Sequence, residues 1–164
     1  MNPKLYHALI SWLGAFMGIG LLAWLHQSIL SPQDLVMIVG SFGASAVLLY
    51  SAWESPLAQP RNLIGGHILS AIIGVSCFLF LPGPYWVQAA AAVATAIFVM
   101  ELTGTTHPPG GATSLIAVIG SEQVHNLGYL YVLIPIGVGA GLMLVVALLL
   151  NFFSSERSYP RRWF

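Results

Sequence analysis

Charged side chains are scarce in this chain of 164 residues. Five Lys and Arg and five Asp and Glu make up only 6% of the sequence, whereas a soluble domain is usually about a quarter charged. With 57% of its residues hydrophobic, the composition predicts an integral membrane protein with several crossings. The formal net charge is zero, so nothing indicates a nucleic-acid partner or a protein held at the membrane surface by electrostatic attraction.

Cysteine is almost absent too. The chain has one, Cys77, which lies in an apolar run. A single cysteine excludes an intrachain disulfide and favours a packing role. His67, Glu101 and His107 lack the close spacing of a metal motif, and the chain shows no nucleophile motif or cofactor fingerprint. We therefore expect no metal, no cofactor and no enzymatic activity.

Long apolar runs, by contrast, are plentiful. Four of them are long enough to cross a hydrocarbon core of about 30 Å as helices: residues 5–25, 63–81, 85–102 and 127–153. Residues 35–50, for which Ser31 and Pro32 are well placed to start a helix, are interrupted by glycine and serine, and residues 112–120 form only a half-helix. Residues 1–164 are predicted to be one all-α transmembrane domain, a polytopic membrane helix bundle.

The two halves of the chain, residues 5–81 and 85–153, resemble each other as pseudo-repeats. Gly43-Ala44-Ser45 in the first half matches Gly111-Ala112-Thr113 in the second. Each half would hold a long span, a short or broken helix at its centre, and a second span. Three elements per half give the halves opposite orientations, as in transporters whose midplane sites use the ends of discontinuous helices. Four full spans with two re-entrant segments would fit the same pattern.

The stretch of residues 101–114 is polar and rich in helix breakers, although apolar runs flank it. Pro108-Pro109 should end an incoming helix by about His107. Gly110-Gly111 let a ligand approach the backbone closely. A helix over residues 112–120 would present unpaired N–H groups and the positive end of its dipole, which favour an anion. This stretch is therefore the leading candidate for a binding site.

The few charges also predict a topology. If six elements cross, all basic residues fall on one side: Lys4, Arg61, Arg157, Arg161 and Arg162. The positive-inside rule then places both termini in the cytoplasm. We expect a multi-pass protein of the plasma or inner membrane.

Ionisable residues at membrane depth are costly and mark functional sites. Arg61, beside Asn62, could bind an oxyanion with paired donors or simply anchor the topology. Glu101 and His107 are candidates for proton handling, while His67 and His107 could contact a ligand or only pack. The predicted anion-binding residues are Gly43, Ala44, Ser45, Arg61, Asn62, His67, His107, Gly110, Gly111, Ala112, Thr113 and Ser114.

The motif His107-Pro108-Pro109, followed by Gly-Gly-Ala-Thr, resembles the signature of the HPP family of small integral membrane proteins. Residues 42–49, 56–62 and 65–67 resemble other blocks shared in that family. Its members are usually described with four transmembrane helices, and members from photosynthetic cells have been assigned nitrite transport. The resemblance therefore implies a transporter of a small inorganic anion, with nitrite as the expected substrate.

Other functions fit the sequence less fully. The chain could form an anion channel, or it could be a structural or assembly protein of the membrane with no transport activity. An enzyme that uses Glu101 and His107 as acid and base would still need a nucleophile. Small side chains such as those of residues 89–92 invite close helix contacts, so we expect a homo-oligomer, in the simplest case a dimer. The other expected partners are the lipid bilayer and the anion.

Overall fold

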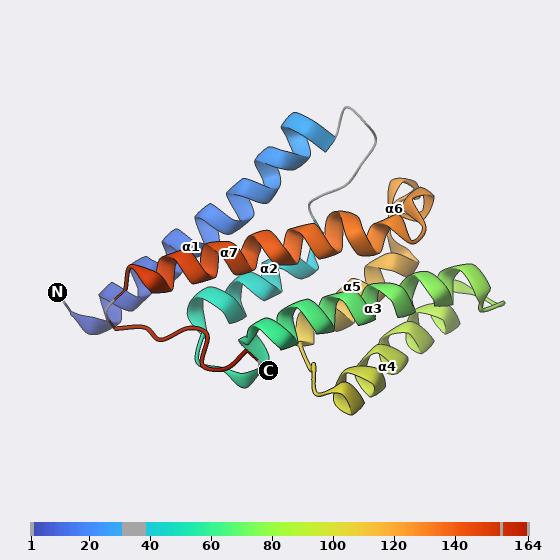
Figure 1. Ribbon diagram of the computed structural model, residues 1–164. Helices are drawn as coiled ribbons and strands as arrows, with labels where there is room; N and C mark the ends of the chain where they lie inside the picture. The colour runs from blue at the N-terminus through green and yellow to red at the C-terminus, as the bar shows by residue number, and fades with distance from the viewer. Residues whose placement is uncertain (1, 31–38, 155, 164) are drawn as a thin grey trace.

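The computed structural model describes residues 2–30, 39–154 and 156–163, which form an all-α polytopic bundle without β-strands (Figure 1). The helices are α1 (Pro3–Leu25), α2 (Ser41–Ala46), α3 (Pro60–Phe80), α4 (Tyr85–Thr103), α5 (Pro108–Ile119), α6 (Glu122–Leu127) and α7 (Val138–Phe152). Turns of π-helix extend α1 over His26–Leu30 and α2 over Val47–Ser51, and another, Val132–Gly137, leads into α7. Within the described ranges, four helices are long and apolar enough to cross a membrane.

Neighbouring long helices run antiparallel through the bundle (Figure 1). Tyr6, near the start of α1, and Ser154, just after α7, hydrogen-bond through their hydroxyls at 3.1 Å. Arg61, at the start of α3, donates from Nη2 to the carbonyl of Thr103, at the end of α4, at 2.5 Å. The starts of α1 and α3 therefore lie near the ends of α7 and α4.

The short helix α5 runs alongside α3 in the same direction. Gly66, in the second turn of α3, lies against His107 just before α5, and Gly74, two turns later, lies against Ser114 in the middle of α5. Further along, the rings of Phe78 and His125 stack with centroids 3.9 Å apart. The short helix α5 therefore lies along α3 from its second turn towards its far end.

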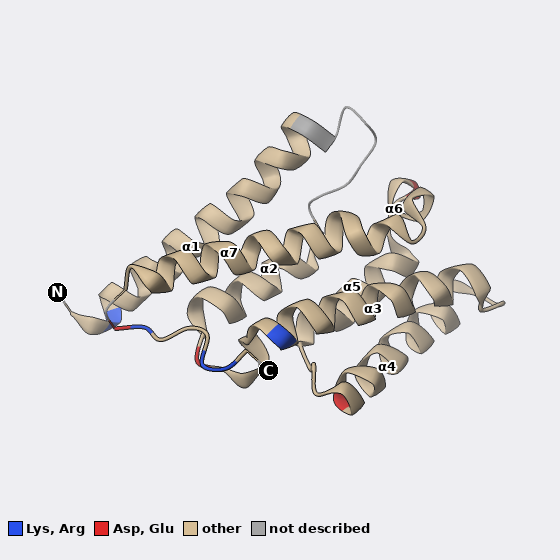
Figure 2. Ribbon diagram, in the orientation of Figure 1, with Lys and Arg blue, Asp and Glu red and all other residues tan. Residues whose placement is uncertain are grey.

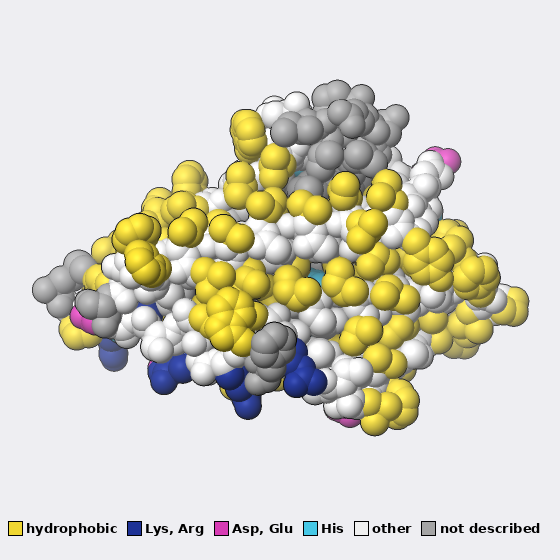
Figure 3. Space-filling model, in the orientation of Figure 1, with side chains coloured by type: hydrophobic (Ala, Val, Ile, Leu, Met, Phe, Trp, Pro, Cys, Tyr) yellow, Lys and Arg dark blue, Asp and Glu magenta, His cyan; other side chains and the backbone are white. Residues whose placement is uncertain are grey.

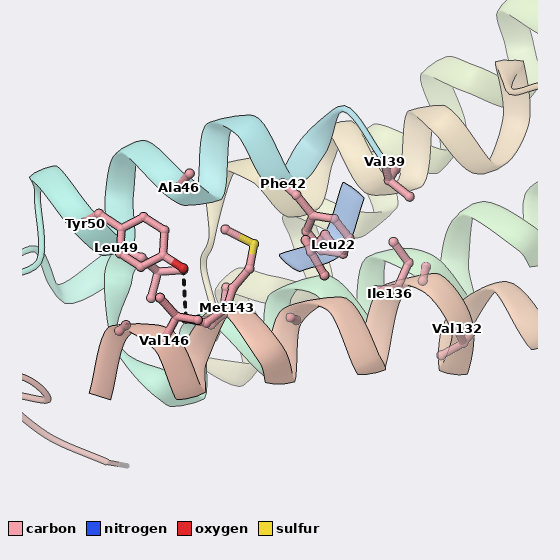
Figure 4. Close-up of a cluster of buried hydrophobic side chains, with 14 of the residues drawn as sticks. Leu22, Val39, Phe42, Ala46, Leu49, Tyr50, Val132, Ile136, Met143 and Val146 are labelled. Atoms are coloured by element: carbon pink, nitrogen blue, oxygen red, sulfur yellow. Dashed lines mark hydrogen bonds between the residues drawn. The ribbon is translucent and has the colours of Figure 1, made fainter. Parts of the chain in front are cut away.

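An apolar core holds α2 against α7 (Figure 4). The Tyr50 hydroxyl donates to the carbonyl of Met143 at 3.1 Å, and the Tyr50 ring fills the space that a side chain at Gly18 of α1 would need. In the same way the Phe42 ring covers Gly139 of α7. Small residues let membrane helices approach closely, and these contacts fix the position of α2 beside the other helices.

Three element boundaries differ from the predictions. Helix α3 begins at Pro60, because proline suits the first turn of a helix, so Arg61 and Asn62 lie on the helix instead of before it. Helix α5 begins at Pro108 for the same reason, not after the glycines. The last span bends at Ile134–Pro135, where Ile134 is extended (φ −130°, ψ 118°), because proline interrupts the helix there.

Both predicted halves contain a long helix, a short helix and a long helix in the same order. That residues 5–81 and 85–153 are an internal repeat stays a prediction. The helix start predicted at Ser31 and Pro32 lies outside the described residues.

The basic residues gather at one end of the bundle (Figure 2): Lys4, Arg61, Arg157, Arg161 and Arg162. Large apolar side chains cover much of the remaining surface (Figure 3). Trp12 and Phe16 of α1, for example, are 63% and 66% exposed. Outward-facing aromatic and aliphatic groups with so few charges suit contact with lipid. The protein is an integral, multi-pass membrane protein.

Candidate functional site

Four polar side chains meet in the interior between α2, α3 and α5. Ser45 Oγ lies 2.8 Å from Nε2 of His67 and 3.0 Å from Nε2 of His107. Nδ1 of His67 lies 2.7 Å from the Thr113 hydroxyl. All four side chains are fully buried. We call Ser45, His67, His107 and Thr113 the imidazole cluster.

The conformation of His107 follows from the residues around it. It precedes α5 in an extended conformation (φ −140°, ψ 102°), because Pro108 disfavours helical geometry at the residue before it. Gly66 lies beside it without a side chain, which leaves room for the Cβ of His107. Nδ1 of His107 donates to the carbonyl of Leu57 at 2.8 Å. The ring is thus held from both sides, by Leu57 and by Ser45.

Ser45 and Thr113 occupy matching positions in the two resembling segments, and they bind opposite nitrogens of His67. The Thr113 hydroxyl also lies 2.9 Å from Ser41 Oγ. Since Ser41 faces Thr113 while Ser45 faces His107, α2 runs antiparallel to α5. This antiparallel pairing brings the two hydroxyls to one histidine.

A cavity of about 190 Å³ opens at the basic end of the bundle; its lining residues are Pro56, Gln59, Arg61, Asn62, Gly104, Arg162 and Trp163. Two guanidinium groups, from Arg61 and Arg162, supply its positive charge. Asn62 Nδ2 donates to the carbonyl of Thr106 at 2.9 Å, and Thr106 directly precedes His107. This hydrogen bond therefore links Asn62, in the cavity wall, to the chain segment that carries His107 of the imidazole cluster.

The C-terminal segment folds back to bring Arg162 to this cavity. Nη1 of Arg157 donates to the carbonyl of Tyr50 at 2.9 Å, and the Tyr159 hydroxyl donates to the carbonyl of Ala58 at 2.8 Å. Burial raises the pKa of Tyr159, because a buried phenolate loses its hydration. The phenol therefore stays protonated and keeps donating at neutral pH.

The structure divides the predicted anion-binding residues into three groups. Four of them form the imidazole cluster: Ser45, His67, His107 and Thr113. Two line the cavity: Arg61 and Asn62. The remaining six belong to neither group: Gly43, Ala44, Gly110, Gly111, Ala112 and Ser114.

The residues of the third group serve packing or face outward. Gly43 and Ala44 are exposed on α2, and a Cβ added at Gly111 would meet no atom within 4 Å. Gly110 packs closely against the α3 backbone. The Ser114 hydroxyl donates to the carbonyl of Gly111 at 2.9 Å, within its own helix.

The prediction of free N–H groups at the amino end of α5 is wrong for its first three positions. Pro108 and Pro109 have no N–H, and the N–H of Gly110 donates to the carbonyl of His107 at 2.7 Å. Moreover, α2 and α5 are antiparallel, so their amino ends lie at opposite ends of the pair. The predicted helix began at Ala112, after the glycines; because α5 begins at Pro108 instead, the N–H groups from Ala112 onwards lie inside the helix. Side chains supply the polar groups instead.

Glu101, predicted to handle protons, lies exposed in the last turn of α4 and takes no part in the cluster. Within the described residues, no third His, Cys, Asp or Glu joins His67 and His107 to make a metal-ligand set. The sequence analysis missed Leu57, Gln59, Gly104, Arg162 and Trp163. Gln59 stands in one of the shared blocks, whereas no local pattern shows that the C-terminal segment folds back.

Comparison with known proteins places this arrangement in a family. The HPP transmembrane-region model matches residues 1–160. Two transmembrane proteins of Dictyostelium discoideum are similar over 156 residues, or 93% of this chain: one is 43% identical and covered to 54% of its length, the other 44% identical and covered to 50%. The chain thus spans about half the length of these curated relatives, and no solved structure matches it. Because nearly all of its length is matched, the chain belongs to the HPP transmembrane family.

Proposed function

We propose that this protein transports a small inorganic anion across its membrane and that nitrite is the substrate. The main support is the connection between a basic cavity, lined by Arg61 and Arg162, and a buried cluster of imidazoles and hydroxyls. Guanidinium groups suit oxyanions because their planar donors pair with two oxygens at once. The choice of nitrite rests on the transport assigned to family members from photosynthetic cells, since the Dictyostelium relatives are named only as transmembrane proteins.

The proposed path begins in the cavity and continues to the imidazole cluster. Arg61 and Arg162 attract the anion from the aqueous side, and Asn62 offers an amide next to the segment that carries His107. Beyond it lie two buried histidines and their hydroxyl partners. Ionisable groups at this depth are costly to bury and are typical of ion pathways.

A carrier suits this cluster better than an open channel. Ser45 bonds directly to both His67 and His107, so these side chains must separate before an anion can pass between them. Such a separation requires α2 or α5 to move, as in transporters that expose a central site to each side in turn. A carrier predicts an uptake rate that saturates with nitrite concentration, whereas a channel predicts a much weaker dependence.

The cavity leads to a quantitative prediction. In liposomes that contain only this protein, Arg61→Gln should require about tenfold more nitrite for half-maximal uptake. A hydrogen bond to a charged group contributes about 1.5–3 kcal/mol, and about 1.4 kcal/mol corresponds to a factor of ten in affinity. Initial rates of nitrite uptake over a range of concentrations measure the change.

Lys4→Gln is the matched control, because it removes the same charge at the same end of the bundle while Lys4 does not line the cavity. An equal loss in the two variants would assign the effect to general surface charge. Uptake by the parent protein that does not exceed protein-free liposomes would overturn transport itself and favour a structural or assembly role.

We also propose that the basic end faces the cytoplasm, with both termini inside a plasma or inner membrane. The test places single cysteines at Lys4, Gly83 and Arg157 in a Cys77→Ser background. An impermeant thiol reagent added outside intact cells should label only Gly83→Cys. Labelling of Lys4→Cys or Arg157→Cys from outside would reverse the topology.

A further inference from the structure

The hydrogen bonds of the imidazole cluster allow one arrangement of protons when both rings are neutral. The carbonyl of Leu57 can only accept, so Nδ1 of His107 carries a proton and its Nε2 does not. The Ser45 hydroxyl must then donate to His107, and its oxygen accepts from Nε2–H of His67. Nδ1 of His67 therefore accepts from the Thr113 hydroxyl. Every donor in this chain points towards His107.

One added proton reverses the chain without breaking a contact. When a proton reaches the Thr113 oxygen, the Thr113 proton moves to Nδ1 of His67, and the proton on Nε2 of His67 moves to Ser45. The Ser45 proton then moves to Nε2 of His107, which becomes an imidazolium. Each donor now points the other way, and the Thr113 hydroxyl can donate to Ser41 Oγ, 2.9 Å away, or to the carbonyl of Pro109, 3.2 Å away. The cluster thus accommodates both the neutral state and a state with one extra proton.

Among the residues that the structure describes, no acidic side chain pairs with either ring to balance that extra proton. The described groups that contact the two rings are Ser45 and the Phe42 ring from α2, Thr113 from α5 and the carbonyl of Leu57. Met100 of α4 lies near Gly66, beside His107. The Tyr131 hydroxyl donates to the carbonyl of Thr113 at 3.1 Å. Neither ring forms an ion pair within the described residues. A positive charge here is therefore balanced only by an anion that enters the site.

Spacing limits the cluster to one such charge. The ring centroids of His67 and His107 are 4.9 Å apart, and two positive charges this close in a buried site would repel strongly. A single proton can be stabilised on either ring through Ser45. One proton and one monovalent anion then leave the site neutral.

We propose that the imidazole cluster binds one proton together with each anion, so that nitrite and a proton cross the membrane in the same direction. This inference rests on the proposed transport of nitrite. Because each bound charge stabilises the other, the loaded and the empty site are both neutral, and either can cross without moving net charge. The proton is released with the anion on the far side, and the chain of hydrogen bonds returns to its neutral direction.

The test uses the whole protein in liposomes, with protein-free liposomes to correct for nitrous acid that crosses the lipid unaided. Proton coupling predicts that an inward proton gradient raises the initial rate of nitrite uptake above that of protein-free liposomes; the initial rate is measured because unaided nitrous acid would bring both kinds of liposome to the same steady-state accumulation. A membrane potential imposed with valinomycin and potassium should have no effect.

Ser45→Ala should abolish the response to the proton gradient, whereas Ser45→Thr, which keeps the hydroxyl, should retain it. Ser76→Ala is the matched control, because the Ser76 hydroxyl on α3 contacts the Ile72 carbonyl and the Tyr129 hydroxyl and not the cluster.

The outcomes separate this inference from the proposed function. Nitrite uptake by the parent protein that follows the membrane potential and ignores the pH gradient would overturn proton coupling but leave transport standing. A full response to the gradient in Ser45→Ala would exclude the relay through this hydroxyl.

A second measurement tests the proton relay through Ser45 without depending on nitrite transport. Nitrogen NMR of labelled histidine in nanodiscs reports the protonation of each ring without any anion, with His67→Gln and His107→Gln used to assign the signals. The parent protein should take up one proton that both rings share, so that their signals shift together. In Ser45→Ala, which lacks the hydroxyl between the two rings, each ring should titrate by itself. Two rings that titrate independently in the parent protein would overturn the proposal.

Discussion

Replacing Gly74 with valine is expected to leave little folded protein in the membrane. A Cβ at this position would lie 2.6 Å from the carbonyl oxygen of Ser114 and 2.8 Å from the Cβ of Ala117. The Ser114 atoms belong to the backbone of α5 and cannot rotate away, so α3 and α5 would have to separate. Overpacking of a close contact costs about 1–3 kcal/mol or more, and valine adds two further methyl groups. Thermal unfolding of detergent-purified protein, followed by tryptophan fluorescence, measures the loss.

Gly141→Val is the matched control, because it makes the same substitution within a helix, α7, where an added Cβ would meet no atom within 4 Å. Intrinsic helix propensity changes equally in the two variants, so the difference between them isolates helix packing. If Gly74→Val unfolded at the same temperature as Gly141→Val, the close approach of α3 to α5 would be wrong.

This contact also shows where sequence analysis stops. The long spans follow from apolar length, and the helix end near Phe80 follows from Pro82, which interrupts a helix. Helix α4 ends at Thr103, before the limit that Pro108-Pro109 set, because Gly104 caps it in a left-handed conformation. Nothing local identifies Gly74 as a contact residue, because a glycine in a membrane helix can also face lipid, as Gly20 does with no atom near its missing Cβ. Only the packing of α5 against α3 distinguishes the two.

The candidate site, too, could be predicted from the sequence only in part. The sequence identified Ser45, His67, His107 and Thr113 separately, since each is a polar residue at or near a helix break. Their convergence depends on α2 lying antiparallel to α5, and that pairing is a tertiary contact between segments more than 60 residues apart. The same limit applies to Arg162, which reaches the cavity because the C-terminal segment folds back over the basic end.

Charge has a different role in the cavity and in the imidazole cluster. At the cavity, Arg61 and Arg162 carry permanent charges that can attract an anion at any physiological pH. In the interior, no fixed charge accompanies the two histidines within the described residues, so the site can alternate between neutral states. A permanent positive charge at that depth would hold the anion too tightly for release, because conduction requires binding that is favourable but weak.

Replacing His67 with glutamine is therefore expected to reduce nitrite uptake to the level of protein-free liposomes while the protein still folds. The glutamine amide provides both a donor and an acceptor, so the hydroxyls of Ser45 and Thr113 can keep a partner and escape the cost of about 1–3 kcal/mol for an unsatisfied buried group. An amide does not take up a proton near neutral pH, however, so the relay between Thr113 and His107 ends there. Initial rates of nitrite uptake and the elution profile of the purified variant provide the two measurements.

His125→Gln is the control for the loss of an imidazole as such. His125 lies on α6, where its ring stacks on Phe78 and stands outside the cluster, so this variant should transport at the parental rate. A His67→Gln protein that folds and still transports near that rate would show that the ring of His67 only packs. The anion path would then depend on the basic cavity alone, and the pairing of Ser45 with two histidines would have to be explained as a means of holding α2 against α3 and α5.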